Sequence, residues 1–380
     1  MAILRVLQVF TIMDIGGAEC MIMNYYRNID RTKIQFDFLV HRSSKGDFDE
    51  EIRGLGGVIY RLEAINPLFP NGYYTALRKF FNVHNSYQII HSHLNTFSCF
   101  PLKIAQEFNI PCRIAHAHIA IDKINLLSII AKKESFKETV KKIIKLQLKK
   151  KVSRYATHYF TCGKKAGEWL FGKQVTLTLM PNAIATQNFK FSPEVSTKYR
   201  AIENLEGSII IGHVGRLDSQ KNHSFLLHIL AELCKKNIQF HLVIVGEGPL
   251  KSKLVLESEK LQINERVHFL GLRTDVAQLY QMFDYFVFPS FYEGLPVTLI
   301  EAQAAGLKVL ASDTITKETK LTNNLEFLTI KDPPATWANK ILEIGNYKRR
   351  DTTDEIINGK YDIVSNCNAI TKFYLDQKSS

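Results

Sequence analysis

The sequence lacks the features that would hold a chain in a membrane or cross-link it. Its apolar segments fall short of the about 18 residues needed to span a bilayer, and the most apolar, Ile119–Ala131, is interrupted by Asp122 and Lys123. It has only six cysteines, none of them in a C-x-x-C pair, which argues against a zinc site or a disulfide framework. The first residues show neither a basic leader nor a small-residue cleavage site. We therefore expect a cytoplasmic protein with reduced thiols.

Low-complexity tracts and short repeats are also absent, and so is a complete dinucleotide-binding fingerprint. The segment Gly246-Glu-Gly248-Pro follows an apolar run but does not extend to G-x-G-x-x-G. The lack of that pattern, together with the lack of its downstream acidic residue, argues against an NAD-dependent enzyme.

The length and composition favour two globular domains with an anionic partner. At 380 residues the chain is about twice as long as a typical domain, and 46% hydrophobic residues suffice for two cores. The formal net charge of +12 is compatible with nucleic acid, an anionic membrane surface or a phosphate-bearing substrate.

The first half of the chain alternates short apolar runs with helical patterns. A helical pattern from Ala18 to Ile29 follows the first run. This alternation indicates βαβ units, and hence a parallel sheet covered on both faces. The strand candidates are Leu4–Phe10, Phe36–His41, Val58–Leu62, Gln88–Ser92, Arg113–His116, Tyr159–Cys162 and Thr176–Met180.

The same alternation restarts after a polar connector, Phe189–Gly207. We therefore expect two Rossmann-like, doubly wound α/β domains that face a cleft, spanning residues 1–187 and 188–361, with ligands at the carboxyl ends of the strands. The strand candidates of the second half are Ile209–Val214, Phe240–Val245, Val267–Leu270, Tyr285–Pro289 and Val309–Ala311. Its helix candidates are His223–Lys235, Leu250–Leu261, Val276–Met282, Thr298–Ala305 and Trp337–Glu343, and Ile363–Tyr374 ends the chain.

A pair of glutamates late in the chain gives the strongest functional signal. Glu293 lies in a loop after a strand candidate, and the turn residues Gly294, Leu295 and Pro296 follow it. A helix that starts near Val297 would offer free backbone N–H groups to an anion. One turn into that helix, the Glu301 carboxylate could accept hydrogen bonds from two vicinal hydroxyls, as on a ribose. The alternative is an ordinary loop glutamate followed by an exposed helix glutamate.

A basic loop gives the second signal. Arg216 and Lys221 lie five residues apart, between a strand candidate and a helix candidate. A planar guanidinium and an ammonium on one loop suit a diphosphate that gains negative charge as it leaves. The same residues could instead be surface cations.

Glycine and histidine pairs follow strands of the first half. Gly17, in Gly16-Gly17, would let backbone N–H groups approach a phosphate. His116 and His118 end a strand candidate on one face, and either could contact a sugar or be structural. No acidic third ligand lies near them, so no metal site is predicted. His91 and His93 raise the same question.

Lysines are concentrated between Lys132 and Lys151, with apolar residues interleaved at helical spacing. Such a segment can be an ordinary amphipathic helix with solvated lysines. It could also lie on an anionic membrane surface, where each lysine would contribute about 1 kcal/mol.

Taken together, these motifs resemble the retaining GT-B glycosyltransferases of family 4, in particular those of bacterial exopolysaccharide and capsule synthesis. The resemblance covers nearly the whole chain, and the paired-glutamate segment is specific to this group. One departure is Ala183, where relatives usually carry glycine after Pro-Asn. The other matching segments are Gly16–Glu19, Arg113–His118, Glu168–Gly172, Met180–Ile184, Val214–Leu217, Gln220–His223, Val245–Pro249 and Phe269–Gly271.

The resemblance implies a role for each candidate residue. Arg216 and Lys221 would hold the diphosphate of a nucleotide-sugar, and Glu301 the ribose. Glu293 would act near the reacting sugar, and His118 or His116 would contact the donor hexose. Further donor contacts are implied for Gly17, for Gly294, Leu295, Pro296 and Val297, and, through the backbone beside the base, for Leu272 and Arg273.

The resemblance also implies that no metal or other cofactor is needed, since no D-x-D motif follows a strand candidate, and that a final helix at about 362–380 returns to the first domain. By the same resemblance, the expected reaction is transfer of a hexose or N-acetylhexosamine, with retention, from a UDP-linked donor to a saccharide or lipid-linked acceptor. Acceptor contacts are expected roughly within Ile65–Tyr74 and Thr96–Ile124.

Two other interpretations of the sequence remain open. Nucleotide-sugar epimerases and phosphorylases share the architecture, but a basic helix would bring them little benefit. A nucleic-acid-binding protein could explain the charge, but no aromatics are interleaved with the cations in a known binding module, and paired glutamates in a phosphate loop would oppose that role. We therefore expect no nucleic-acid partner.

Overall fold

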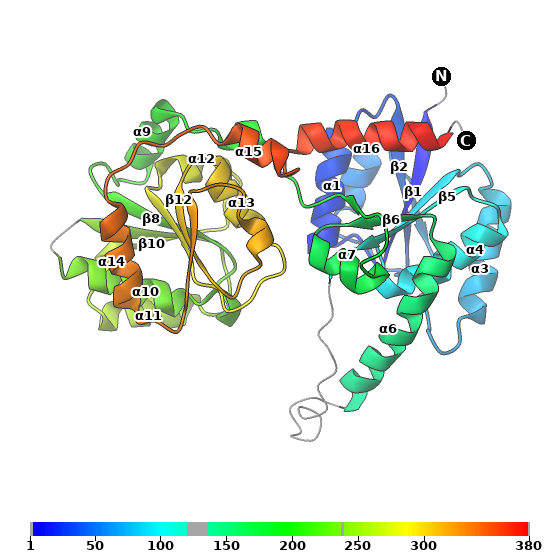
Figure 1. The fold of residues 1–380 in the computed structure, drawn as a ribbon, viewed down its shortest axis with the longest axis horizontal. Helices are drawn as coiled ribbons and strands as arrows, with labels where there is room; N and C mark the ends of the chain where they lie inside the picture. The colour runs from blue at the N-terminus through cyan, green and yellow to red at the C-terminus, as the bar shows by residue number, and fades with distance from the viewer. Residues whose placement is uncertain (1–2, 120–135, 237–238, 379–380) are drawn as a thin grey trace. The chain divides into compact units, whose positions relative to one another are not determined.

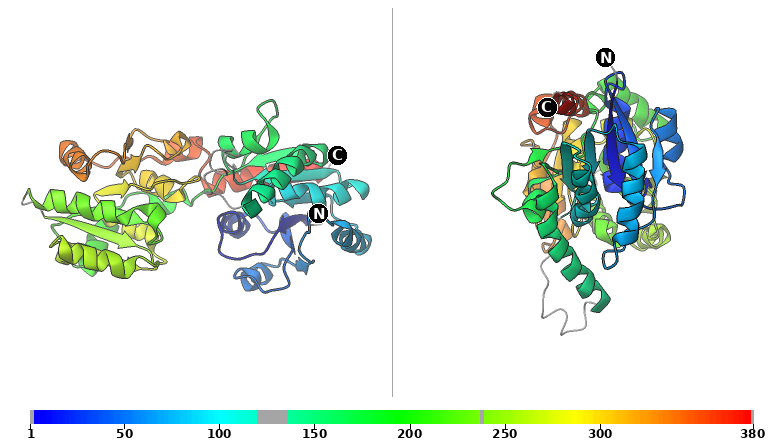
Figure 2. Two further views of the ribbon diagram at one scale, coloured as in Figure 1. Left: turned by 90° about the horizontal axis from the view of Figure 1, so that it is seen from below. Right: turned by 90° about the vertical axis from the view of Figure 1, so that its right-hand side faces the viewer.

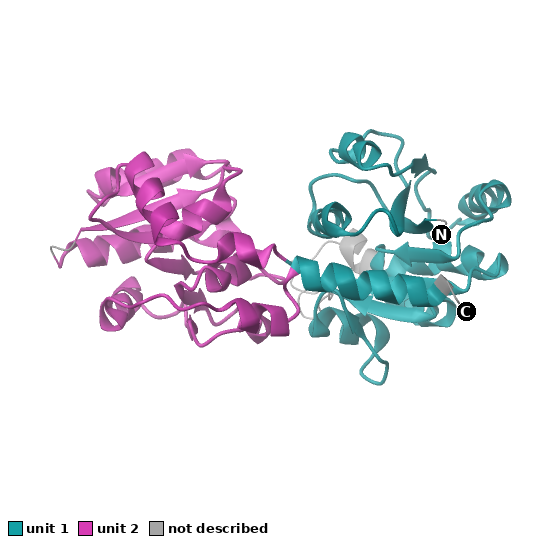
Figure 3. Ribbon diagram, turned by 90° about the horizontal axis from the view of Figure 1, so that it is seen from above, with its two compact units in different colours: residues 1–183, 363–380 teal, residues 184–362 magenta. Residues whose placement is uncertain are grey.

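The computed structural model describes residues 3–119, 136–236 and 239–378. It consists of two compact units, residues 1–183 with 363–380 and residues 184–362 (Figure 3). The sequence predicted domains at 1–187 and 188–361, with a final helix returning to the first. In the described residues, no helix has the length and apolar character needed to cross a membrane.

Unit 1 contains a seven-stranded parallel sheet in the order β3-β2-β1-β4-β5-β6-β7 (Figure 1). Its central strands are nearly continuous apolar runs because helices cover both faces of the sheet. The strands are β1 (Leu4–Phe10), β2 (Ile34–Val40), β3 (Ile59–Arg61), β4 (Ile89–Ser92), β5 (Cys112–Ala117), β6 (His158–Thr161) and β7 (Thr178–Leu179).

The helices of unit 1 connect these strands, and the end of the chain adds one more. Helix α16 packs beside α1 (Figure 1). Its Tyr374 ring lies edge-on to the ring of Phe36 in β2. Helix α6 extends away from the sheet of this unit (Figure 2). The helices are α1 (Gly17–Asn28), α2 (Asp49–Gly54), α3 (Asn71–Val83), η1 (Asn95–Ser98), α4 (Cys99–Glu107), α6 (Phe136–Tyr155), α7 (Lys164–Phe171) and α16 (Ile363–Lys378).

Unit 2 contains a six-stranded parallel sheet in the order β10-β9-β8-β11-β12-β13. Counted from its own first strand, this is the 3-2-1-4-5-6 order of dinucleotide-binding folds. The strands are β8 (Ile209–Val214), β9 (Phe240–Val245), β10 (Val267–Gly271), β11 (Tyr285–Phe288), β12 (Lys308–Ser312) and β13 (Leu325–Leu328).

Two apolar cores lie on the two faces of that sheet. One joins it to α10, α11 and α14, and the other to α8, α12, α13 and α15. The α-helices of unit 2 are α8 (Thr186–Phe189), α9 (Pro193–Ile202), α10 (His223–Cys234), α11 (Lys251–Lys260), α12 (Val276–Met282), α13 (Val297–Ala304), α14 (Pro334–Ile344) and α15 (Thr353–Asn358). Its short 3-10 helices are η2 (Ser219–Lys221), η3 (Asn264–Arg266) and η4 (Lys317–Thr319).

Both sheets confirm the predicted fold class, but two details of the prediction were wrong. The segment Phe189–Gly207 is not simply a polar connector, because it contains helix α9, which begins with Pro193 and is capped by the Ser192 hydroxyl. The strand Leu325–Leu328 was missed; it pairs with β12 at the edge of the sheet. Of the basic segment Lys132–Lys151, the part from residue 136 belongs to α6, and the part before it lies outside the described residues.

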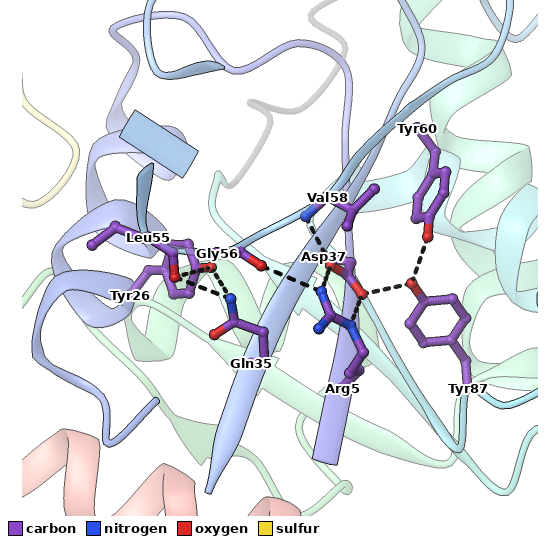
Figure 4. Close-up of polar contacts among 9 residues, drawn as sticks. All are labelled: Arg5, Tyr26, Gln35, Asp37, Leu55, Gly56, Val58, Tyr60 and Tyr87. Atoms are coloured by element: carbon purple, nitrogen blue, oxygen red, sulfur yellow. Dashed lines mark hydrogen bonds and ion pairs between the residues drawn. The ribbon is translucent and has the colours of Figure 1, made fainter. Parts of the chain in front are cut away.

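A buried carboxylate ties the first strands of unit 1 together (Figure 4). Asp37 of β2 is fully buried and pairs with the Arg5 guanidinium of β1. Its oxygens also accept hydrogen bonds from the Tyr87 hydroxyl, at 2.7 Å, and the Val58 backbone N–H, at 2.8 Å. Because these donors satisfy the charge, Asp37 can remain in the core and fix the pairing of β1 and β2.

Candidate active site

The two strongest sequence motifs meet at the point in unit 2 where the strand order reverses. Strands β8 and β11 are neighbours there, although they are far apart in the sequence. The basic loop follows β8, and the paired-glutamate segment follows β11. In doubly wound sheets, the carboxyl end of the strands at this position is where ligands bind.

Hydrogen bonds hold the two loops against each other. The Asn222 side-chain amide donates to the Pro289 carbonyl at 3.2 Å. The Phe291 backbone N–H donates to the Gln220 carbonyl at 2.9 Å, and the Gln220 side chain returns a bond to the Tyr292 carbonyl at 2.9 Å. The loops therefore form one surface, whose geometry depends on residues about seventy positions apart.

Lys221 and Glu293 form an ion pair within this surface. Lys221 Nζ lies 2.7 Å from Glu293 Oε1, and Gln220 Nε2 lies 3.1 Å from Glu293 Oε2. The pair is mostly shielded, with side-chain exposures of 16% and 8%. Lys221 Nζ also lies 4.9 Å from the centroid of the Phe288 ring. The structure thus brings together two residues that the sequence assigned separately to the diphosphate and the sugar.

A cavity of about 560 Å³ adjoins the basic loop in unit 2. Arg216, Leu272 and Arg273 line it together with Gly246–Gly248 and Val276. Its volume lies within the range of small-ligand sites. The Arg216 side chain is exposed and makes no ion pair with any described residue, so its guanidinium can reach an anion in the cavity.

Arg273 contributes to this cavity differently. Its guanidinium is held by both oxygens of Asp275, at 2.8 and 2.6 Å, and by Glu203 at 2.9 Å. Because these carboxylates already bind the Arg273 guanidinium, we expect a ligand in the cavity to contact the backbone of Leu272 and Arg273 instead. Leu272 itself is 81% exposed.

One wall of the cavity depends on glycine. Gly246 has φ of +136°, and a Cβ there would lie 2.2 Å from the Gly215 carbonyl oxygen. Only a residue without a side chain lets the loop after β9 touch the loop after β8. Gly246 therefore has a structural role, because it shapes the cavity wall.

Glu301 lies in α13 and is held by a tyrosine. The buried Tyr280 hydroxyl of α12 donates to Glu301 Oε2 at 3.0 Å. Burial raises the Glu301 pKa to about 7, and the tyrosine bond opposes this rise. Tyr280 lies one turn from Val276, which lines the cavity. Tyr280 was not predicted from the sequence, because a tyrosine in a helix pattern is indistinguishable from a core residue.

The residues between the two glutamates form the predicted turn and helix start. Gly294 is exposed, and a Cβ there would meet nothing within 4 Å. Leu295 and Pro296 follow, and α13 begins at Val297 without a side-chain cap. The first N–H groups of the helix therefore lack a side-chain partner, as an anion site requires.

Four histidines cluster at the carboxyl ends of β4 and β5 in unit 1, where His91 and His116 lie within the strands and His93 and His118 follow them. The His93 and His118 rings are joined by a 2.9 Å hydrogen bond, and the His91 and His116 rings by one of 3.1 Å. Stacking of His91 on His93 and of His116 on His118 confirms that each pair shares a face. Burial lowers the pKa of His91, His93 and His116 well below the ordinary value, so these rings are neutral.

The hydrogen bonds also assign the tautomer of His118. The Gln8 side-chain oxygen can only accept, so His93 Nε2 donates to it, at 2.9 Å. His93 Nδ1 must then accept from His118 Nε2. His118 is left with a lone pair on Nδ1, and desolvation lowers its pKa to about 3. A neutral imidazole of this kind can accept a bond from a sugar hydroxyl.

His116 does not fit the alternative role that the sequence gave it. Its ring is fully buried and lies between His91 and His118. It therefore supports the cluster, whereas His118 is the partly exposed member of the pair. Ring nitrogens of His91, His93 and His116 lie within 4.8 Å of one another, but those that face each other are already joined by hydrogen bonds, which a metal ion would have to replace.

Gly17 is the first residue of α1, directly after the loop that leaves β1. A Cβ at Gly17 would meet nothing within 4 Å, whereas one at Gly16 would lie 2.4 Å from a Glu19 carboxylate oxygen. The Glu19 side chain is flexible and Gly16 has an extended backbone, with φ of −132°, so within unit 1 the local packing does not demand glycine at position 16, and the space around Gly17 remains open.

A second cavity, of about 250 Å³, lies in unit 1. Arg42 and Lys145 line it, and neither was singled out in the sequence. The only available signal for Arg42 was its position directly after a strand. Lys145 could not be distinguished from the other lysines of its helix.

Comparisons with known proteins agree with this geometry. The pattern of the family described as "Glycosyl transferases group 1" matches residues 195–357. The putative glycosyltransferase EpsF of Bacillus subtilis is 32% identical, over 97% of this chain and 96% of its own length. CapH of Staphylococcus aureus, a capsular polysaccharide biosynthesis glycosyltransferase, is 24% identical over 98% of this chain and 99% of its own.

Solved structures match across the whole fold. Anabaena HepE in complex with UDP superposes with a TM-score of 0.70 at 18% identity, covering 99% of this chain and 97% of its own. A glycosyltransferase from Rickettsia africae superposes with a TM-score of 0.74 at 14% identity, covering 99% of each chain. At these identities the likeness shows the fold alone. Together with the identity to EpsF over nearly the full length, it confirms the predicted resemblance: this chain belongs to the group 1 glycosyltransferases and has the GT-B fold.

Proposed function

We propose that this glycosyltransferase moves a hexose or N-acetylhexosamine from a UDP-linked donor to a saccharide or lipid-linked acceptor, with retention of anomeric configuration, in cell-surface polysaccharide synthesis. The observation that carries the proposal is the joined pair of loops at the strand reversal of unit 2. They place Arg216 at a ligand-sized cavity and Lys221 beside Glu293.

The donor would be recognised by residues that line the cavity and by Lys221 and Glu301 from the adjoining loop and helix. Arg216 and, once a diphosphate competes with Glu293 for it, Lys221 would bind the phosphates through charge-assisted hydrogen bonds. Glu301, held by Tyr280, would accept hydrogen bonds from the ribose hydroxyls. The backbone at Leu272 and Arg273 would meet the base. Two cations would provide the charge that the leaving diphosphate requires, so we propose a reaction that needs no metal ion.

In the transfer step, an acceptor hydroxyl oxygen forms a bond to the anomeric carbon of the sugar. The bond from that carbon to the phosphate oxygen breaks, and its electron pair leaves with the diphosphate. The hydroxyl proton passes to a phosphate oxygen on the same face of the sugar, which gives retention. Arg216 and Lys221 stabilise the departing charge, and His118 Nδ1 accepts a hydrogen bond from a sugar hydroxyl.

Related proteins support the choice of donor and pathway. HepE has been crystallised with UDP and with UDP-glucose. CapH is described as a capsular polysaccharide biosynthesis glycosyltransferase, and an Escherichia coli relative, 25% identical over 54% of this chain, transfers galactose from UDP-Gal to a diphosphoundecaprenol-linked sugar. We propose UDP and polysaccharide synthesis for this chain on that basis.

We also propose that the protein works in the cytoplasm, against the inner face of the membrane. Helix α6 extends from unit 1 with Lys145, Lys149 and Lys150 along it and with Ile143 and Leu146 exposed. Cations beside exposed apolar side chains suit an anionic lipid surface. The protein should sediment with vesicles that contain anionic lipid at low salt and not with neutral vesicles. Equal behaviour with both would contradict this part of the proposal.

The donor proposal is tested by a thermal-shift panel of UDP-, GDP- and ADP-sugars, followed by turnover with the donor that stabilises the protein. Arg216→Ala and Lys221→Ala should each lower turnover about 10- to 100-fold, because charge-assisted bonds contribute about 1.5–3 kcal/mol each. Lys253→Ala, which removes an exposed lysine of α11, is the control.

Product analysis separates this activity from that of an epimerase or phosphorylase. A new glycoside with the donor's anomeric configuration, formed in the presence of EDTA, is the expected product. Full activity in both the Arg216 and Lys221 variants would contradict the assigned site, and an epimerised sugar without a glycoside would contradict the assigned reaction.

A further inference from the structure

The cavity of unit 1 lies at the carboxyl edge of its sheet. Thr11, Arg42, Ile65 and Ile119 reach it from the segments after β1, β2, β3 and β5. Residues Leu94–Phe97, after β4, and Lys145, from α6, complete its lining together with His41. This is the ligand-binding edge of a doubly wound sheet, and none of the donor contacts assigned above lies within the cavity.

The charged side chains that line this cavity are all positive. Arg42 and Lys145 line it, and no aspartate or glutamate is among its described lining residues. The Arg42 guanidinium bonds to the His41 carbonyl at 2.8 Å and makes no ion pair in the described part of the chain, and neither does Lys145. His41 adds no charge, because burial lowers its pKa to about 4. Two cations without carboxylates at a concave site suit an anion with more than one charged oxygen.

Apolar side chains border the same cavity. Ile65 and Ile119 line it, and the loop that carries Ile65 continues to Leu68 and Phe69, which are 67% and 77% exposed. The Asn66 side-chain oxygen accepts bonds from both of their backbone N–H groups, at 3.0 and 3.3 Å, and so holds the backbone of this loop.

Helix α6 adds to this border. Ile143 and Leu146, which flank Lys145, are 44% and 40% exposed. Isolated exposed apolar residues are common, but a group of them next to a cationic cavity favours a ligand with an anionic head and a hydrocarbon tail.

The cavity also adjoins the candidate sugar contact. Asn95, one of its lining residues, has φ of +51°, a conformation that is uncommon outside glycine. Its side-chain oxygen accepts the His118 backbone N–H at 2.9 Å. A ligand in the cavity would therefore lie beside the residue proposed to contact the transferred sugar.

We infer that this cavity binds the diphosphate and the first prenyl units of a lipid-linked acceptor. Arg42 and Lys145 hold the diphosphate, and Ile65, Leu68 and Phe69 contact the hydrocarbon chain. This inference rests on the proposed function, since it assigns the acceptor class to a transferase whose donor binds in unit 2.

Binding of farnesyl diphosphate, farnesol and inorganic diphosphate to the full chain tests the inference without knowledge of the acceptor sugar. All titrations are made with saturating UDP, which occupies the donor cavity. Farnesyl diphosphate should bind at least about tenfold more tightly than either of the other two probes, because only it has both the charged head and the chain.

Variants test which residues contact farnesyl diphosphate. Arg42→Ala and Lys145→Ala should each weaken farnesyl diphosphate binding about tenfold, and added salt should weaken it further. Lys173→Ala, which removes an exposed lysine of unit 1 outside the cavity lining, should leave it unchanged. Leu68→Ser with Phe69→Ser should weaken farnesyl diphosphate and leave inorganic diphosphate unaffected.

The outcomes separate the inference from the proposed function. If UDP binds and farnesyl diphosphate does not, or if the Arg42 and Lys145 variants bind it as the wild type does, the inference is overturned and the donor proposal stands. Equal binding of inorganic and farnesyl diphosphate would overturn the lipid assignment. Failure of UDP and every UDP-sugar to bind would contradict the proposed function itself.

Discussion

Replacing Glu301 by glutamine should stabilise the protein at pH 8 while impairing donor binding. Burial raises the pKa of this carboxyl group to about 7, against an ordinary 4.5. A raised pKa means that the folded state disfavours the ionised form, so stability is lost as the pH rises from about 4.5 to about 7. Each pH unit of such a difference corresponds to about 1.4 kcal/mol. The ionised carboxylate therefore lowers the free energy of unfolding by about 3 kcal/mol at pH 8.

Glutamine has nearly the same shape and carries no charge. Glu301→Gln should therefore raise the melting temperature of the full chain at pH 8 and change it little at pH 4.5. Differential scanning calorimetry across that range measures both values. Glu265→Gln, which replaces an exposed glutamate, is the matched control and should show no gain that depends on pH.

The same carboxyl group should make donor binding depend on pH. Ribose hydroxyls bond best to the ionised form, and at pH 6 a group with a pKa of about 7 is about nine-tenths protonated. The affinity for a UDP-sugar should therefore rise about tenfold from pH 6 to pH 8, and this rise should vanish in Glu301→Gln. A UDP-sugar is the right ligand because its diphosphate, unlike that of UDP, does not titrate here. A variant that is less stable than wild type at pH 8, with an unchanged pH profile of binding, would refute the reasoning.

Three further changes test the fold and the cavity. Gly246→Ala should cost more than about 3 kcal/mol of stability in urea unfolding and abolish UDP binding, because the added Cβ would collide with the Gly215 carbonyl; unaltered binding would show that the cavity wall tolerates a shift. Tyr87→Phe should cost about 1–3 kcal/mol by the same assay, since Asp37 loses one of its buried donors, and a neutral result would mean that Arg5 suffices. Ser192→Ala should cost about 1 kcal/mol through loss of the α9 cap, unless water replaces the hydroxyl.

Much of the fold was predictable because local signals agreed with it. Strands β1, β8 and β9 coincide with the predicted ranges, since buried parallel strands read as short apolar runs with clear ends. Helix α9 was missed because its ten residues have few buried apolar positions and Pro193 looked like a loop residue, although proline suits the first turn of a helix. Strand β13 lies at the sheet edge, and its burial pattern is too weak to show in a run of four residues.

The site was less predictable, because its contacts join distant residues. The sequence motifs indicated Glu293 and Lys221 separately, but their ion pair spans 72 positions and depends on the adjacency of β8 and β11. The support of Glu301 by Tyr280 and the burial of His116 likewise follow from packing. Arg42 and Lys145 share a cavity only because α6 packs against η1, the short helix that follows β4.

Hydrogen–deuterium exchange of the full chain with and without UDP tests the central claim most directly, namely that the joined loops of unit 2 bind the donor nucleotide. We predict slower exchange in peptides that cover residues 214–221, 246–248, 272–276 and 294–301, with the control helix α11 unchanged. The claim would be contradicted if, with UDP bound, exchange slowed only in unit 1 or slowed in none of these segments.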